Sequence, residues 1–192
     1  MKKVSFLTFI FAASAISANA TITIQAISNS ATGLILDSSE QSLGETGYMR
    51  IGVFDEAALE LLSISELADY DTVDSLFTEY TTFTSASGNF LSNTNITYPG
   101  TAGENLYAWV FNSTSPESAD EYAIFGSSSW TVPNDTGTAN LVSSQINNVV
   151  FGSTIAGSPT NYALSPVPEP STFAAIAGVL ALGFTATRRR RA

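Results

Sequence analysis

The chain has 192 residues, with 17 acidic and 7 basic side chains and a formal net charge of -10, and it contains neither cysteine nor histidine. The absence of these two residue types excludes disulfides, thiolate nucleophiles, Cys/His metal sites and a Ser-His-Asp triad. At this length a single globular domain is expected.

The first 20 residues have the three parts of a secretory signal peptide. Lys2 and Lys3 make a positive start, and residues 4–16 form an uncharged, mostly apolar run of 13 residues. Such a run is too short to cross a bilayer, which takes roughly 20 apolar residues. Ala18 and Ala20 then supply the small-x-small pattern of a signal peptidase site. We predict a signal peptide over residues 1–20; the alternative is an ordinary core helix.

Residues 21–165 are predicted to form an extracytoplasmic domain that is mainly β. Runs rich in Thr, Ile, Val and aromatic residues, bounded by Gly, Asn and Ser clusters, are typical of strands. The pattern favours a small antiparallel β-sandwich of about eight strands. The predicted strands are residues 21–27, 34–36, 47–54, 105–112, 121–125, 129–132, 146–151 and 161–164.

A helical insertion is predicted between residues 55 and 80, where apolar side chains recur at helical spacing. The side chains that carry this spacing are Ala58, Leu61, Leu62, Leu67, Val73, Leu76, Phe77 and Tyr80. Asp55 is the expected N-cap of the first helix, and Ser65 and Asp71 are expected to cap later ones. One or two short helices packed on a sheet fit this pattern better than one long helix.

Three aspartates, Asp69, Asp71 and Asp74, lie within six residues. Several carboxylates together can bind calcium, but this segment lacks the spacing and the glycine of an EF-hand loop. The simpler interpretation is a solvated helix start with capping aspartates, so no metal ligand is predicted.

The predicted strand over residues 105–112 is apolar on both faces, as expected of a strand covered on both sides. One face carries Tyr107, Trp109 and Phe111. An exposed stripe of this kind could stack on sugar rings, but burial in the core is the simpler interpretation, and the same holds for Trp130.

The amino-acid composition leaves few groups that could carry out acid/base or nucleophilic catalysis. Paired carboxylates, as in glycosidases, are the only common acid/base pair left, and nothing in the sequence brings two of them to a defined separation. We therefore predict a protein that is not an enzyme, with no catalytic residue and no cofactor.

The last part of the chain, residues 166–192, contains a second addressing segment. Pro168, Glu169 and Pro170 are followed by an apolar stretch at residues 171–187, which is 17 residues or about 25 Å of helix, and this is the lower limit for a membrane span. The terminal arginines, Arg188, Arg189, Arg190 and Arg191, are expected to stay in the cytoplasm by the positive-inside rule. With a signal peptide at the other end, the body is predicted outside and the tail inside.

The order of Pro-Glu-Pro, short apolar helix and terminal arginines resembles the PEP-CTERM sorting signal of bacterial exported proteins. This resemblance covers about residues 166–192 and implies cleavage near the motif by an exosortase in a Gram-negative bacterium that secretes exopolysaccharide. It implies a precursor anchored in the inner membrane and a product at the cell surface or in the extracellular matrix. The alternative is a single-pass anchor that is never cut.

Without its two ends, the chain is far more acidic than the whole sequence suggests. Residues 21–167 retain one basic residue, Arg50, against sixteen carboxylates, so their formal charge is 1 − 16 = −15. Nucleic acid and anionic lipid headgroups are excluded as partners, because both require a basic surface. The expected partners are signal peptidase, exosortase and exopolysaccharide. Two functions stay open: a matrix protein without catalytic activity, or a carbohydrate-binding module assisted or not by calcium.

Overall fold

The computed structural model describes residues 20–98, 101–134 and 136–167, and it is mainly β with few helices and antiparallel-rich sheets, as predicted. Its strands are β1 (Ala20–Ser28), β2 (Ile35–Leu36), β3 (Tyr48–Phe54), β4 (Phe77–Thr84), β5 (Phe90–Tyr98), β6 (Asn105–Phe111), β7 (Glu121–Thr131), β8 (Thr138–Val142), β9 (Asn148–Phe151), β10 (Ser153–Ile155), β11 (Ser158–Ala163) and β12 (Ser165–Pro166). Its helices are α1 (Glu56–Leu59), α2 (Ile64–Leu67), α3 (Tyr70–Asp74) and the 3-10 turns η1 (Pro116–Ser118) and η2 (Ser143–Gln145).

The main sheet has six strands and is antiparallel throughout. Its order is β12-β7-β6-β3-β4, with β9 paired to β7. Strand β6 lies in the middle of this sheet and pairs with β3 on one side and β7 on the other. The second sheet has the order β5-β1-β8, and a small third sheet has the order β10-β11-β2.

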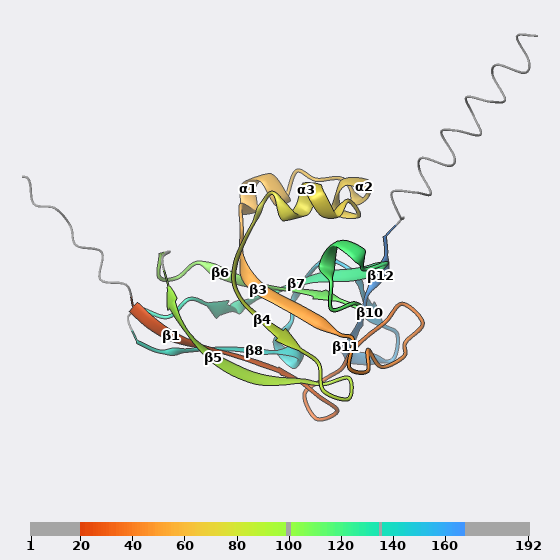
Figure 1. Cartoon of the computed structure of the whole chain (residues 1–192), viewed down its shortest axis with the longest axis horizontal. Helices are drawn as coiled ribbons and strands as arrows, with labels where there is room; N and C mark the ends of the chain where they lie inside the picture. The colour runs from red at the N-terminus through yellow and green to blue at the C-terminus, as the bar shows by residue number, and fades with distance from the viewer. Residues whose placement is uncertain (1–19, 99–100, 135, 168–192) are drawn as a thin grey trace, which may run out of the picture.

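One face of the main sheet packs against the second sheet (Figure 1). The core between them, called the inner core here, takes Leu106 and Val110 from β6 and Ile22 and Ile24 from β1, all at most 1% exposed. Alternation along each strand explains this, because successive side chains point to opposite faces and only one face of β1 is apolar.

The opposite face of the main sheet is covered by α1, α2 and α3 (Figure 1). Under them lies the helix-side core, to which β6 contributes Tyr107, Trp109 and Phe111. The helices are tied to the sheet by a buried hydrogen bond of 2.5 Å from the Tyr122 hydroxyl of β7 to the carbonyl of Leu67 in α2. The predicted helical insertion packed on a sheet is confirmed.

The helix caps differ in part from the prediction. Asp55 caps α1 as expected, accepting a bond from the backbone N–H of Ala58. Ser65 and Asp71 are not caps: Ser63 caps α2 through a reciprocal capping box with Glu66, and Asp69 stands at the N-cap of α3 without a side-chain bond. The capping box satisfies two backbone donors at once, which explains why the helix starts two residues before the expected site.

The predicted helical insertion, which ended at residue 80, is too long, because residues from Phe77 onward form strand β4. Phe77 and Tyr80 are three apart, as on one face of a helix, but they lie on opposite faces of the main sheet. Alternation along the strand explains this, because side chains three apart in a strand point to opposite faces. A β-bulge at Tyr80, where Ile51 pairs with Thr81 and Gly52 with Glu79, also interrupts the pairing with β3.

Strands β5, β8, β10 and β12 were not predicted, and the two predicted strands at residues 121–125 and 129–132 are one strand, β7. β5 and β8 flank β1 in the second sheet, and most of their outward residues are polar, such as Asn and Thr. Such polar strands lack the apolar density by which strands are identified in a sequence.

The predicted signal peptide core, the Pro-Glu-Pro motif, the span at residues 171–187 and the arginine tail lie outside the described residues. Among the residues that the structure does describe, no helix is long and apolar enough to cross a membrane.

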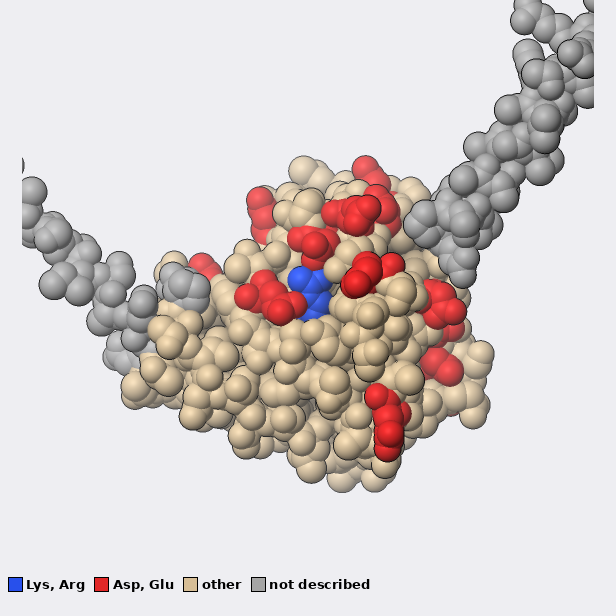
Figure 2. Space-filling view, viewed as in Figure 1, with Lys and Arg blue, Asp and Glu red and all other residues tan. Residues whose placement is uncertain are grey.

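Arg50, on β3, is the only basic residue among those described, and its side chain is 12% exposed. Its guanidinium forms 2.5 Å ion pairs with Asp74 of α3 and Glu79 of β4. It also lies 4.9 Å from the ring centroid of Phe77 and 5.0 Å from that of Trp109. Figure 2 shows a single blue area beneath the helices, between red carboxylates. The residue therefore joins the helical layer to two strands of the main sheet.

We expect Arg50→Met to lower the free energy of unfolding by about 1–3 kcal/mol, because it leaves two neighbouring carboxylates without a counter-charge. The loss stays below that for a fully buried pair, since Asp74 and Glu79 are 41% and 38% exposed and can hydrate. Arg50→Lys should lose less, but an ammonium lacks the planar fork that reaches both carboxylates and stacks on the rings. Urea unfolding of the three proteins measures this, and an unchanged midpoint for Arg50→Met would contradict the role given to Arg50.

Candidate functional site

The aromatic stripe of β6 is buried, as the simpler interpretation predicted. Trp109 and Phe111 are 0% exposed, Tyr107 is 7% exposed, and Trp130 is 2% exposed in the inner core. The Trp109 ring has the rings of Tyr70, Phe77, Phe111, Tyr122 and Phe54 at centroid distances of 4.9 to 6.0 Å. A sugar ring has no access to Trp109 or Phe111, so a stacking site centred on this stripe is ruled out.

The three aspartates of the helical insertion do not converge. Asp74 is engaged by Arg50, and Asp69 accepts a hydrogen bond from the hydroxyl of Thr72. Across residues 20–98, 101–134 and 136–167, no group of three or more acidic side chains is arranged to hold a metal ion. The interpretation of these residues as parts of a helix start agrees with the position of Asp69 at the N-cap of α3 and of Asp71 in its first turn.

A polar hollow of about 200 Å³ opens at one end of the main sheet's strands, where β6 begins and the pairing of β7 is irregular. Most of the residues in its wall carry an amide or a hydroxyl group. The residues that line it are Asn105, Tyr107, Gly126, Ser127, Ser128, Asn147 and Asn148.

Irregular pairing between β6 and β7 creates this hollow. Tyr107 pairs with Gly126, but Asn105 pairs with Thr131, so the segment between Gly126 and Thr131 bulges out of the ladder. Gly126 leaves room beside the Tyr107 ring, because a Cβ there would lie 3.0 Å from the ring and would require it to shift. The bulge and the missing side chain leave one edge of the ring beside the open space.

The wall of the hollow is held in place by hydrogen bonds. The Asn105 amide and the Tyr107 hydroxyl both donate to the carboxylate of Glu56 on α1, at 2.8 and 2.9 Å. On the other side, the Asn147 amide donates to the Ser128 hydroxyl at 2.8 Å. Asn148 is exposed, and within the described chain its amide makes no hydrogen bond. The hollow thus offers both donors and acceptors without a positive charge, which suits a neutral, hydroxyl-rich ligand rather than an anion.

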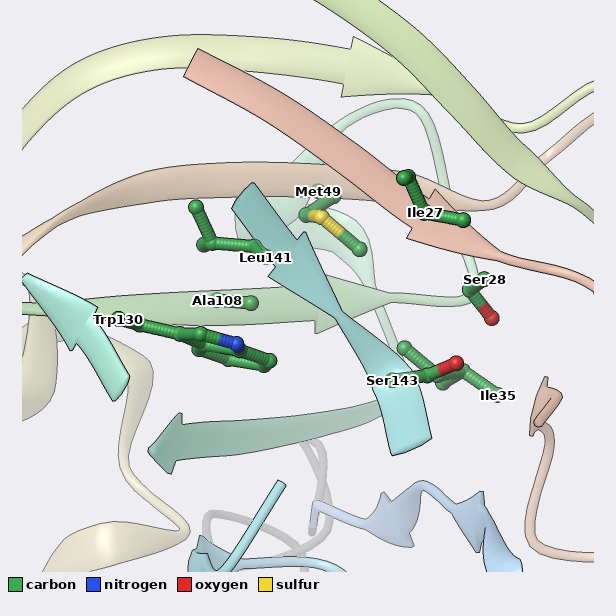
Figure 3. Close-up of a pocket in the computed structure, with 8 residues that line it drawn as sticks. All are labelled: Ile27, Ser28, Ile35, Met49, Ala108, Trp130, Leu141 and Ser143. Atoms are coloured by element: carbon green, nitrogen blue, oxygen red, sulfur yellow. The ribbon is translucent and has the colours of Figure 1, made fainter. Parts of the chain in front are cut away.

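A second cavity lies inside the molecule, between the two packed sheets (Figure 3). Its volume is about 10 Å³, which is room for one water at most. The residues that line it are Ile27, Ser28, Ile35, Met49, Ala108, Trp130, Leu141 and Ser143. The hydroxyls of Ser28 and Ser143 both donate to the carbonyl of Gly33, at 3.0 and 2.7 Å. This cavity is a packing defect and not a ligand site.

The sequence held a signal for the polar hollow that strand prediction did not use. The gap between the two predicted strands, residues 126–128, is the bulged segment that lines the hollow, and Asn147-Asn148 faces it from the start of β9. A Gly-Ser-Ser interruption in an apolar strand indicates a bulge, but only the tertiary fold brings the two asparagines beside it.

No protein-family model, curated protein or solved structure matches this chain.

Because of its buried tyrosines, the fold is expected to lose stability at alkaline pH. Burial, the largest cause, raises the pKa of Tyr107 and Tyr122 well above the ordinary tyrosine value, and the Glu56 carboxylate raises that of Tyr107 further. In the unfolded chain these phenols ionise near pH ~10. Above that pH the folded state keeps protons that the unfolded state loses, so stability is complete below pH ~10 and falls as pH rises.

We expect the free energy of unfolding to decline above pH ~10, by up to about 1.4 kcal/mol per pH unit for each such tyrosine. Tyr107→Phe should make this decline shallower, because it removes one of the ionisable groups. Urea midpoints measured between pH 8 and 11.5 (about the range in which free tyrosine ionises), with tyrosinate absorbance as the second readout, test the effect. Equal slopes for the native protein and Tyr107→Phe would contradict it.

Proposed function

We propose that this chain is an exported envelope or matrix protein with a PEP-CTERM sorting signal, whose β-sandwich body has no catalytic activity and is associated with exopolysaccharide. One observation carries the proposal: both predicted processing sites lie at the ends of the described body, outside the residues that form its two cores. Cleavage at either site would leave the two cores intact.

At the N-terminal limit, β1 begins at Ala20, the residue after which signal peptidase is expected to cut. The first buried residue is Ile22, which is 1% exposed and packs in the inner core. A chain that starts at Thr21 keeps this residue and the pairing of Thr21 with Thr97 in β5.

At the C-terminal limit, the fold reaches Val167, two residues past the expected boundary at 165. β12 pairs Ser165 with Tyr122 and Pro166 with Glu121, and the Val167 N–H donates to the carbonyl of Asp120 at 2.8 Å. Pro168, the first residue of the sorting motif, comes directly afterwards. An exosortase cut in or after Pro168-Glu169-Pro170 would thus spare β12.

A role in binding rather than in catalysis is supported by the polar hollow. Glycoside hydrolysis uses two carboxylates that flank the scissile bond. The residues that line the hollow include no carboxylate, and the neighbouring Glu56 is held by Asn105 and Tyr107.

Processing can be measured on protein recovered from the producing cells. We expect an intact mass that lacks residues 1–20 and the tail Arg188–Arg191, and we expect Glu169→Ala to retain the tail because the motif is altered. A mass that includes the four arginines in the unaltered protein would refute processing and favour the uncut single-pass anchor.

A carbohydrate-binding module is the second candidate, and the polar hollow is the observation that favours it. Amide and hydroxyl side chains surround an edge of the Tyr107 ring, which is the mixture of groups that fixes a neutral ligand in a shallow site. The calcium-assisted form of this function has no carboxylate cluster to support it in the part of the chain that the structure describes.

We expect the protein to be retained on the polysaccharide that its own cells release, and Asn148→Ala to weaken retention about fivefold to tenfold through loss of hydrogen bonds. The matched control is Asn140→Ala, which removes an exposed amide from β8, outside the hollow. A chelator should leave retention unchanged. Equal retention of Asn148→Ala and the native protein would exclude the hollow as the binding site.

A further inference from the structure

Strand β5 forms an open edge of the second sheet. It pairs with β1 alone among the described strands, and its nine residues, from Phe90 to Tyr98, are paired in unbroken register. The strand contains no charged residue and no proline. Its outward side includes Leu91, which is 67% exposed. No other described strand pairs with the backbone groups of β5 that point away from β1.

Proteins usually protect such edges with charge, proline, bulges or short strands, and the other sheet edges of this protein are protected in these ways. β4 carries Glu79 and a bulge at Tyr80, and β12 is two residues long and contains Pro166. β8, the opposite edge of the second sheet, is five residues long, and β10 is three. β5 is the only described edge strand that is at once long, regular and uncharged.

The charge distribution restricts which partner can approach this edge. The body carries a charge of −15, so two copies repel each other over most of their surface. The second sheet is different, because β1, β5 and β8 contain no charged residue at all. Figure 2 shows most of the carboxylates on the helices and just below them, and the lower left of the view, where β1 and β5 run, is mostly tan. Glu104 lies at the end of β5, where it accepts a hydrogen bond from the Tyr98 hydroxyl. Two copies can therefore meet at β5 with their acidic faces kept apart.

We propose that β5 is a self-association edge, through which two copies of this chain pair their β5 strands antiparallel about a two-fold axis. Identical strands related by such an axis run antiparallel, and the contact is the same from both sides. The pairing gives one continuous sheet of order β8-β1-β5-β5-β1-β8. When it is centred on Thr94, Asn93 of one copy lies opposite Asn95 of the other, and Leu91 opposite Thr97.

The contact is small, since it consists of one strand pair and its side chains, and contacts of this size belong to weak, reversible complexes. The two paired strands carry no charge, whereas both bodies carry a negative charge and repel each other. Added salt screens the repulsion between the bodies, so dimerisation strengthens with ionic strength instead of weakening as an ionic contact does.

The test uses protein recovered from the producing cells, of a length established by its intact mass. Sedimentation equilibrium should show a concentration-dependent dimer, with a dissociation constant that falls as salt is added. Hydrogen exchange should show that residues 90–98 gain protection as the protein concentration rises, while residues 138–142 do not. A chain that stays monomeric at every concentration, or a dimer that salt dissociates, overturns the proposal.

Two isosteric variants provide the matched comparison. Asn93→Asp places one carboxylate from each copy across the proposed contact and should raise the dissociation constant at least about threefold, because like charges on paired strands destabilise the pairing. Asn140→Asp adds the same charge on β8, at the other edge of the same sheet, and should leave the constant unchanged. Equal weakening by both variants, or by neither, rules out β5 as the interface.

Discussion

Both faces of strand β6 are apolar and must be buried, and the arrangement of the other layers follows from this constraint. Leu106, Ala108 and Val110 point to one side and Tyr107, Trp109 and Phe111 to the other, and none is more than 7% exposed. A strand that is apolar on both faces must be enclosed on both. The second sheet encloses one side and the short helices the other, so the body has three layers around one central strand.

The contact between the helical layer and the main sheet is partly apolar and partly ionic. The helices are short, at four or five residues each, and helices of that length are not stable alone. They are held by burial of Leu59, Leu67 and Val73 and by Arg50, whose single positive charge is shared by α3 and β4. Burial lowers the pKa of Arg50, but its two carboxylate partners outweigh that effect and raise it, so the guanidinium stays charged wherever the fold exists. The only described cation is thus used inside the structure, and the outer surface keeps a strongly negative balance.

The surfaces of the body differ in chemistry, and the differences fit the proposed role of a secreted protein that binds neutral polysaccharide. Acidic side chains gather on the helical side and keep copies apart in solution (Figure 2). The polar hollow beside Gly126 presents amides and hydroxyls, and the second sheet presents an uncharged edge at β5. Attachment to polysaccharide and pairing with a second copy would use separate places, so neither function would interfere with the other.

Local sequence patterns were sufficient to predict most of the individual helices and strands. Alternation identified β6 with the correct faces, and helical spacing placed the insertion after Asp55, because these patterns record burial that each element needs wherever it packs. The failures have a common cause. Phe77 and Tyr80 were assigned to a helix although pairing with β3 makes them part of a strand, and β5 was missed because pairing with β1, not an apolar pattern of its own, makes it a strand.

By itself the sequence determined the mainly β class, the excess of negative charge and the chemistry that missing cysteine and histidine exclude, because all of these depend on residue type and spacing alone. It favoured the burial of Trp109 but left an exposed stripe open. Only the tertiary structure decided that the aspartates of the insertion separate, that Asn147 and Asn148 meet the bulge after Gly126, and that β5 is left as an open edge. These features join segments far apart in the chain. Their geometry is set by strand register and packing, which no local pattern of residues specifies.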